Sequence, residues 1–260
     1  MNETQFFAEE RQRIILEKLE ADSKVLVPDL ADFFNVSLAT IRTDLRELEN
    51  AGQLIRTHGG AIPLWRASFE QNAAQKQTSH IEEKHRIAKA ALGLVKDGDT
   101  IAIDTGTTAI EFAKALQTKS GLTIITNDLI IAAMFEDATD FNIIMIGGRI
   151  RKGFHCTLGE MALESINDVN VDLAILCANA FNIERGFMTP TPEHAEMKKR
   201  MKGIASKTVM LMGSYKIGGI SLYTFAGLSD IDVWITDDGI GNAVEKEILD
   251  AEGNLELIVV

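Results

Sequence analysis

Cysteine is scarce in this chain, which has only Cys156 and Cys177 among its 260 residues. Neither belongs to a C-x-x-C pair, so the sequence excludes a disulfide framework. We therefore expect both cysteines to be reduced and structural, as is usual in the cytoplasm.

Long apolar runs and a basic leader are also lacking. No stretch approaches ~18 uninterrupted apolar residues, so no transmembrane helix and no membrane partner are expected. The first ten residues carry three glutamates and no lysine or arginine. Since a secretory signal needs a basic start followed by a long apolar run, we expect a protein that is not exported.

Positive charge is in deficit, because the formal net charge is −12. An acidic chain is not generally attracted to nucleic acid or anionic membranes, which excludes a non-specific polyanion binder. Hydrophobic residues make up 46% and charged residues 25% of the chain, the balance of a folded globular protein. A small basic surface on an acidic body is still compatible with these values.

The composition changes near residue 65. Residues 1–66 hold eight lysines and arginines against eleven carboxylates, a net charge of −3 that leaves −9 for the rest. Residues 66–83 are polar, with three glutamines and few large apolar side chains, which is typical of a linker. We predict an N-terminal domain over residues 1–62, a linker over 63–83 and a C-terminal domain over 84–260.

The N-terminal domain has helical periodicity over residues 11–20, and two further helices follow. Pro28 suits the first turn of the second helix, and Ser37 is a good N-cap for the third, which Gly52 ends. A strand over residues 54–58 then turns at Gly59-Gly60 and returns through 61–62. The side chains predicted to be buried are Leu30, Phe33 and Phe34 in the second helix and Leu38, Ile41, Leu45 and Leu48 in the third.

Two short helices joined by a tight turn fit a helix-turn-helix, whose second helix lies in the major groove of DNA. Hydroxyl groups there contact phosphates or base edges, and arginines pair with phosphates or read guanine. The candidate DNA-binding residues are Ser37, Thr40, Arg42, Thr43 and Arg46 on the helix and Arg56 and His58 on the hairpin. The periodicity by itself equally fits a three-helix protein-interaction domain with solvated arginines.

The residues themselves carry a resemblance. Residues 36–49 read V-S-L-A-T-I-R-T-D-L-R-E-L-E, and residues 56–61 read R-T-H-G-G-A. These segments resemble the recognition helix, V-S-x-x-T-I-R-x-D-L, and the wing, H-G-G-A, of DeoR-family bacterial repressors. The resemblance implies a winged helix-turn-helix with operator DNA as its partner. Thr43 stands where the family usually has a second basic residue, which implies one weaker phosphate contact or an altered operator sequence.

The C-terminal domain alternates apolar runs with helical patterns. Such near-continuous strands predict a Rossmann-like α/β domain with a mostly parallel sheet covered on both faces. Ligands bind beyond the carboxyl ends of the strands in such sheets. The predicted strands are Thr100–Ile103, Leu122–Thr126, Asn142–Ile146, Leu173–Cys177, Thr208–Met212, Val233–Thr236 and Leu255–Val260.

The first of these strands is followed by a hydroxyl-rich loop and by a helix that starts near Ala109. This arrangement predicts an anion site, because helix N-termini attract negative charge. The loop is Thr105, Gly106, Thr107 and Thr108, and Asp104 before it is placed to accept from sugar hydroxyls. Ordinary turn and cap chemistry explains these residues equally well. Two further strand ends, Thr126-Asn127 and Gly147-Gly148, are predicted at the same sheet edge. Arg149, Arg151 and Lys152 follow, and for the last two we favour a solvated basic loop.

This second domain also resembles the DeoR family, through D-x-G-T-T at 104–108, T-N, G-G, G-x-x-T-P at 186–190 and the Ser-x-Lys element that ends at Lys216. The resemblance runs from about Arg11 to Asp238. It implies a fold like ribose-5-phosphate isomerase, a phosphorylated sugar as effector, repression of carbohydrate-metabolism genes and a homo-oligomer, dimer or tetramer. Departures from the family at Gly213, Cys177, Ala180 and His194 imply an atypical effector or an impaired pocket.

The alternative is a sugar-phosphate isomerase-like enzyme. In it, Asp104 or Glu193 would act as the base, and Lys216 would stabilise an enediolate. The N-terminal winged helix argues against that reading, and Gly213 removes one candidate acid–base group. We expect no cofactor and no metal, since His155 and His194 have no neighbours at metal-ligand spacing.

Overall fold

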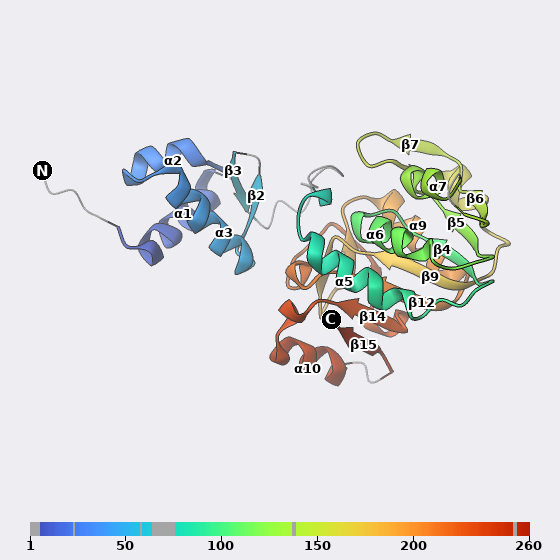
Figure 1. Ribbon diagram of the computed structural model, residues 1–260. Helices are drawn as coiled ribbons and strands as arrows, with labels where there is room; N and C mark the ends of the chain where they lie inside the picture. The colour runs from blue at the N-terminus through green and yellow to red at the C-terminus, as the bar shows by residue number, and fades with distance from the viewer. Residues whose placement is uncertain (1–5, 23, 58, 64–75, 137–138, 252–253) are drawn as a thin grey trace, which may run out of the picture. The chain divides into compact units, whose positions relative to one another are not determined.

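The computed structural model describes residues 6–22, 24–57, 59–63, 76–136, 139–251 and 254–260. The chain divides into two compact units, Met1–Phe69 and Glu70–Val260, which Figure 1 shows in blue and in green to red. Most of the predicted linker, residues 64–75, lies outside the described residues; Pro63 ends a strand and Ile81 begins a helix.

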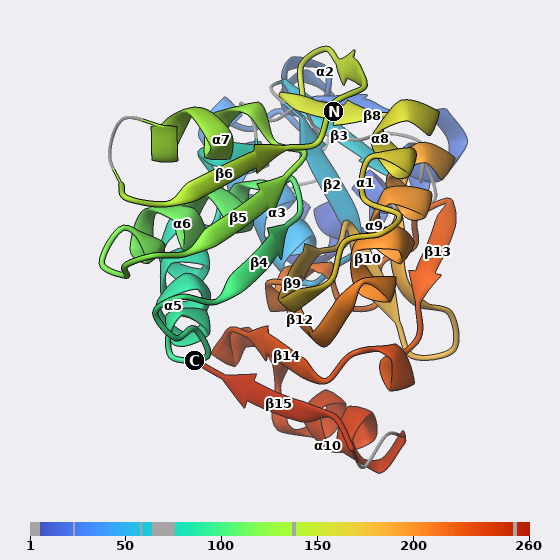
Figure 2. The same ribbon diagram turned by 90° about the vertical axis from the view of Figure 1, so that its right-hand side faces the viewer.

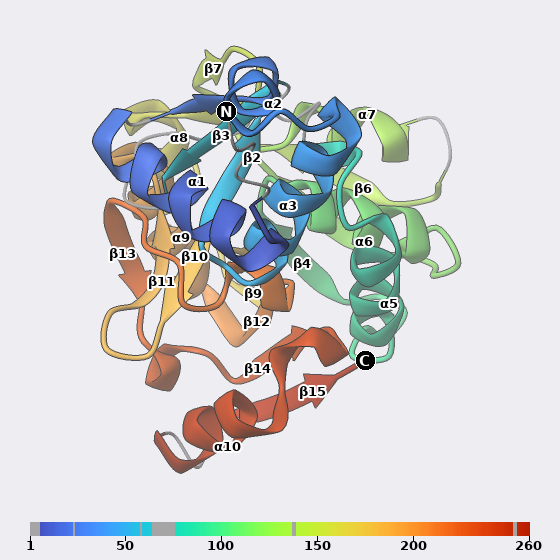
Figure 3. The same cartoon turned by 90° about the vertical axis from the view of Figure 1, so that its left-hand side faces the viewer.

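The first unit is a winged helix (Figure 3). Its helices are α1 (Ala8–Asp22), α2 (Val27–Phe34) and α3 (Leu38–Asn50). Its strands β1 (Val25–Leu26), β2 (Leu54–Thr57) and β3 (Gly60–Pro63) form an antiparallel sheet in the order β1-β3-β2. A Cβ at Gly60 would lie 1.8 Å from the carbonyl oxygen of Val25, so only glycine lets β3 approach β1 this closely.

The turn between α2 and α3 forms as the sequence predicts. Asn35 ends α2 with φ 51°, and the Ser37 side chain caps α3 by accepting from the N–H of Thr40 at 3.1 Å. Two predicted core residues are wrong, because Phe33 and Leu38 are 52% and 44% exposed. Phe33 instead lies on the surface, where Lys18 Nζ is 3.8 Å from its ring centroid.

The buried stripe of α3 contains a charged residue that periodicity missed. Ile41, Asp44, Leu45 and Leu48 are all buried, which is the spacing of one helix face. Asp44 is 2% exposed, and its carboxylate accepts from Arg11 of α1 at 2.8 and 3.0 Å. The pKa of Arg11 is raised chiefly by this hydrogen bond, so the ion pair ties α1 to α3.

The second unit is built on a seven-stranded sheet in the order β15-β14-β12-β9-β4-β5-β6, in which every pairing is parallel. The strands are β4 (Thr100–Ile103), β5 (Thr123–Thr126), β6 (Asn142–Met145), β9 (Val171–Cys177), β12 (Ala205–Leu211), β14 (Val233–Thr236) and β15 (Glu256–Val259). Each overlaps one of the seven predicted strands, and the predicted α/β class with a parallel sheet is confirmed.

Helices cover both faces of this sheet (Figure 2). One face packs on α5 (Ile81–Leu92), α6 (Thr107–Leu116) and α7 (Leu129–Glu136). The other packs on α8 (Glu160–Glu164), α9 (Pro192–Gly203) and α10 (Asn242–Ala251). Alternate residues of each strand enter the two cores, so Ile101 faces the first and Ala102 the second.

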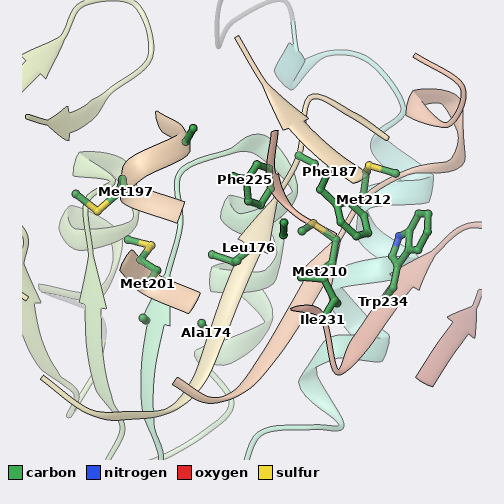
Figure 4. Close-up of a cluster of buried hydrophobic side chains, with 14 of the residues drawn as sticks. Ala174, Leu176, Phe187, Met197, Met201, Met210, Met212, Phe225, Ile231 and Trp234 are labelled. Carbon is green, nitrogen blue, oxygen red and sulfur yellow. The ribbon is translucent and has the colours of Figure 1, made fainter. Parts of the chain in front are cut away.

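Two small sheets were not predicted. A hairpin of β7 (Arg149–Arg151) and β8 (Cys156–Leu158) follows β6, and β10 (Ala180–Asn182), β11 (Gly186–Thr189) and β13 (Tyr223–Ala226) form a second antiparallel sheet. Phe187 and Phe225 of that sheet pack over Met210, Met212 and Trp234 of the main sheet, as Figure 4 shows. These strands have three or four residues each, too few for a period to be recognised in the sequence.

Candidate nucleic-acid interface and effector cavity

The recognition helix α3 presents polar side chains on the face opposite its core. Arg42, Thr43 and Arg46 are exposed and Thr40 is half-buried. An Arg46 guanidinium nitrogen donates to Thr43 Oγ1 at 3.3 Å, and the Ser37 and Thr40 hydroxyls lie 2.8 Å apart. The helix therefore offers hydroxyls at its first turn and two cations over its next two turns.

The wing holds the remaining candidates. Arg56 lies on β2; its backbone N–H donates to Glu49 Oε1 at 3.0 Å, and its guanidinium is 3.5 Å from Glu49 Oε2. Glu49 thereby fixes the start of the wing against the end of α3. His58 lies outside the described residues.

The second unit contains a cavity beyond the carboxyl ends of β4, β5 and β9. Its described lining has three lysines and two histidines but one carboxylate, Asp128. The lining residues are Lys76, Gln77, Thr105, Gly106, Thr107, Thr108, Ile110, Asp128, Ile130, Phe154, His155, Cys177, Ala178, Asn179, His194, Lys198 and Lys216. This is the position at which ligands bind in open parallel sheets.

The predicted loop at 105–108 forms part of the lining. Helix α6 begins at Thr107, two residues before the expected start, so Gly106 is its N-cap. The first N–H groups of a helix have no intrahelical acceptor, and they attract anions. Gly106 has φ 152°, and a Cβ there would lie 3.3 Å from Cβ and Sγ of Cys177. Glycine at this position therefore keeps the loop close to the end of β9.

Two lysines reach the cavity from different elements. Lys216 lies in the 3₁₀ helix η1 (Ser214–Lys216), and its Nζ donates to the carbonyl oxygen of Ala178 at 2.8 Å. Burial, with a smaller contribution from neighbouring lysines, lowers the pKa of Lys216 to about 8. Lys198 of α9 donates to the carboxylate of Asp104 and, at 2.9 Å, to the carbonyl oxygen of Cys177.

Asp128, the cavity's carboxylate, already has three donors. Its Oδ2 accepts from Thr105 Oγ1 at 2.7 Å, and its Oδ1 accepts from the N–H groups of Ile130 and Ile131 at 2.9 and 3.2 Å. Burial raises the pKa of Asp128, against these hydrogen bonds. The side chain therefore holds the 105–108 loop against the first turn of α7.

Five of the predicted effector residues do not line the cavity: Asp104, Thr126, Asn127, Gly147 and Gly148. Asp104 is 1% exposed, with its Oδ2 taken up by Lys198 and the N–H of Cys177. Thr126 Oγ1 donates to the carbonyl oxygen of Ile103, and Asn127 Nδ2 to that of Thr157. They join neighbouring backbone segments, so their contact with a ligand stays a prediction.

Sequence reasoning missed Lys76, Gln77, Phe154 and Lys198 as cavity residues. Lys198 had a signal, because it lies four residues after His194 on α9 and therefore on the same helix face. His194 Nδ1 lies 2.8 Å from Thr191 Oγ1, and its Nε2 lies 3.7 Å from Cys156 Sγ. Both predicted structural cysteines are buried and free, and burial raises the pKa of each to about 11.

The departure at Gly213 has a structural counterpart. A Cβ at Gly213 would lie 2.4 Å from Cε1 of Tyr215, so the tyrosine ring occupies the space that a side chain at 213 would need. Asp237, from the end of β14, accepts from the N–H and hydroxyl of Ser214 at 2.7 and 2.6 Å. The Ser-x-Lys turn is therefore anchored by a carboxylate from a different strand.

Neither proposed base of the enzyme alternative lies at the cavity. Asp104 is paired with Lys198, and Glu193 is 3.4 Å from Arg149. Over the described ranges, no group of three or more histidine, cysteine or acidic residues is placed to hold a metal ion. A search of the same ranges finds no helix with the length and apolarity needed to cross a membrane.

These features define a class of protein, a DNA-binding regulator with a ligand-sensing α/β domain. Family models agree with both parts. Residues 11–64 match the DeoR-like helix-turn-helix domain, and residues 79–238 match the DeoR C terminal sensor domain. The chain belongs to the DeoR family.

Its relatives are similar along nearly the whole chain. The regulator GolR of Listeria innocua is 34% identical over 94% of this chain and 96% of its own length. The regulator GlpR of Haloferax volcanii is 34% identical over 94% and 95%, and the repressor AccR of Agrobacterium fabrum is 32% identical over 91% and 92%. This protein is accordingly a transcriptional regulator and not an enzyme.

The similarity to solved structures is weaker than the similarity to these relatives. Ribose 5-phosphate isomerase of Methanocaldococcus jannaschii is 20% identical over 54% of this chain and 55% of its own, with a TM-score of 0.39. A likeness of that size carries no inference about this chain.

Proposed function

We propose that this regulator represses carbohydrate-metabolism genes and is controlled by a phosphorylated sugar that binds in the cavity. The repressor binds paired operator half-sites as a symmetric homo-oligomer in the cytoplasm. One relative, AccR, is named a transcriptional repressor, which supports the direction of control.

The recognition helix supports operator binding by this chain. Arg42, Thr43 and Arg46 form an exposed face on α3, in a domain whose net charge is otherwise negative. An acidic protein with a few local cations gains little from non-specific attraction to phosphates. Base contacts then supply most of the preference for the operator over other DNA, while Ser37, Thr40, Arg56 and His58 position the helix.

The observation that carries the effector proposal is the N-terminus of α6 inside a lysine-lined cavity. Thr107 and Thr108 add hydroxyl donors to the backbone N–H groups of the first turn of α6, while Lys216 adds a cation. A phosphate dianion is the group that uses such donors best. Among the described lining residues, the one carboxylate, Asp128, already has three donors, so its repulsion of a bound anion is weakened.

Calorimetric titration with matched phosphorylated and free sugars tests this proposal. Fructose 6-phosphate with fructose, ribose 5-phosphate with ribose and glycerol 3-phosphate with glycerol form suitable pairs. We expect at least one phosphorylated member to bind and its free partner to bind far more weakly. Equal affinity within every pair, or no binding by any of them, would show that the 105–108 loop is an ordinary helix cap.

A further inference from the structure

The wall of the effector cavity includes the point at which the chain enters the sensor unit. Lys76 and Gln77 line the cavity. They begin the entry segment, defined here as residues 76–80, which lies directly before α5 in the sequence. The preceding residues connect this segment covalently to the winged helix.

A buried lysine holds the entry segment. Lys84 of α5 is 3% exposed, and its Nζ donates to the backbone carbonyl oxygens of Lys76 and, at 2.5 Å, of Ser79. The Ser79 hydroxyl also donates to the carbonyl oxygen of Lys76, at 3.2 Å. Burying an ammonium group is costly unless it is hydrogen-bonded, so Lys84 favours the one segment conformation that offers it both carbonyls.

The other end of the segment is joined to the turn that carries Lys216. His80 adopts a left-handed conformation, with φ 52° and ψ 43°. Its ring stacks on Tyr215, with centroids 3.8 Å apart and planes 8° from parallel. Tyr215 directly precedes Lys216, so this stacking contact connects the entry segment to the turn that carries a cavity lysine.

Electrostatics links these parts to an anion. After burial, which is the main cause, the charges of Lys76, Lys84 and Lys198 each lower the pKa of Lys216, so these cations disfavour the charged form of the Lys216 ammonium group. Lys76 and Lys216 both line the cavity, and a phosphate bound there attracts both charges. The entry segment therefore carries one of the charges on which such an anion acts.

We propose that the entry segment is both a ligand-contacting wall of the effector site and the element through which the effector alters DNA binding, with Lys84 and His80 as positioning residues. This inference rests on the proposed function, since it requires a phosphorylated effector in the cavity.

The test separates binding from response in the full-length protein. The DNA probe is a duplex selected from a random library by this protein, and the ligand is the tightest binder among ribose 5-phosphate, fructose 6-phosphate, fructose 1-phosphate and glycerol 3-phosphate. In the wild type, we expect the ligand to change duplex affinity about tenfold. Lys84→Met and His80→Ala should bind the duplex as the wild type does, while the ligand, even at saturating concentration, no longer changes duplex affinity.

Matched controls lie on the same helix. Lys89 and His85 are exposed on α5, so Lys89→Met and His85→Ala should respond as the wild type does. Hydrogen exchange supplies a second readout, in which the ligand should slow exchange over residues 76–84 of the wild type. If Lys84→Met fails to fold, His80→Ala decides, because that side chain is 31% exposed and its loss leaves the core intact.

Four results would overturn the inference. Variants that bind the ligand and still respond like the wild type exclude a coupling role for the segment. Unchanged exchange over residues 76–84 in the liganded wild type excludes contact with the wall. Absence of binding by every member of the panel refutes the proposed effector and this inference with it, whereas binding without any change in duplex affinity refutes only the coupling.

Discussion

At the scale of single residues, α3 offers the sharpest test of DNA recognition. Arg42 and Arg46 are exposed and lie outside the buried stripe of the helix. Replacing either by alanine should weaken binding to the selected duplex by about 1–3 kcal/mol without unfolding the domain, since a bidentate base contact is worth that much. Fluorescence anisotropy at fixed salt measures the change.

Arg13 provides the matched control for this experiment. It lies on α1 of the same domain, is exposed and pairs with Glu17 at 2.6 Å. Arg13→Ala should leave duplex affinity within error of the wild type. Unchanged affinity in both α3 variants would contradict the placement of α3 in the major groove.

A second residue-scale prediction concerns the buried pair of Asp104 and Lys198. Asp104→Leu should lower the free energy of unfolding of the sensor unit by about 3–5 kcal/mol, because it leaves a buried ammonium without its counter-ion. Adding Lys198→Met should recover much of the lost free energy of unfolding, since two apolar side chains then replace the ion pair.

Urea unfolding measures both variants, with Trp234 fluorescence reporting the sensor unit in a Trp65→Phe background. Trp234 is buried in the main sheet. A double variant as unstable as the single one would show that Asp104 stabilises the unit through the N–H of Cys177 instead.

Lys216 gives the effector site a pH dependence. Its pKa of about 8 lies below the usual 10.5 because of burial and neighbouring lysines, and burial lowers that of Lys84 to a similar value. The charged form prevails below pH 8 and is lost as the pH rises through 8. Between pH 7 and 9 the Cys177 thiol, with a pKa of about 11, stays neutral, and the phosphate, with a second pKa near 6, stays a dianion.

Affinity for the phosphorylated sugar should therefore fall as the pH rises from 7 to 9, with proton uptake on binding above pH 8. Calorimetry in two buffers of different ionisation enthalpy measures that uptake. Lys216→Met should bind more weakly and with a flatter profile. A wild-type affinity that is constant across this range would place the phosphate away from Lys216.

At the scale of elements, the decisive feature is how α6 begins. Gly106→Val should abolish sugar-phosphate binding, because the position has φ 152° and a Cβ there already meets Cys177 at 3.3 Å. The added side chain displaces the 105–108 loop from the end of β9. Duplex binding should persist, since the winged helix has a core of its own.

Gly203→Val is the control for this variant. Gly203 lies at the end of α9, and a Cβ there meets no atom within 4 Å. This variant should bind the sugar phosphate normally. A Gly106→Val protein with normal affinity would show that the loop does not contact the phosphate.

At the scale of the whole molecule, the chain should separate into two modules. The polar segment from Arg66 to Glu83 is predicted to be the first site of proteolysis. Because Lys84 and Tyr215 hold residues 76–80, we expect the cut before Lys76. Mass spectrometry of brief trypsin digests locates it, and early cleavage within the seven-stranded sheet would contradict the domain boundary.

Patterns in the sequence sufficed for the elements. The seven strands of the main sheet are recognisable because buried parallel strands are short, nearly continuous apolar runs. Ser37 was identifiable as a cap from its chemistry and its place before α3. The predicted burial of Leu38 and Phe33 was wrong, because periodicity identifies the apolar face of a helix but not how much of that face the neighbouring elements cover.

The cavity was only partly predictable, and Lys84 shows why. Helical spacing puts Lys84 on the face of Ile87, Ala88 and Ala91, but a lysine is not expected to be buried without partners. Its acceptors are backbone carbonyls that come within reach only once the entry segment has folded over it. Asp44 and Asp104 are similar, because their partners lie 33 and 94 residues away. Burial of a charge depends on such distant partners, which local patterns do not contain.

The sequence by itself determined the two-part class of this protein, its recognition helix and the glycine-containing loop at the start of α6, because propensity, capping and apolar period are local properties. Only the tertiary structure decided which of the polar strand ends reach the cavity. Thr105–Thr108 reach it with Lys216, whereas Asp104 turns to Lys198 and Asn127 to Thr157. Which of these residues reach the cavity depends on how α9 and the β7–β8 hairpin pack on the sheet, and such packing is a property of the folded chain.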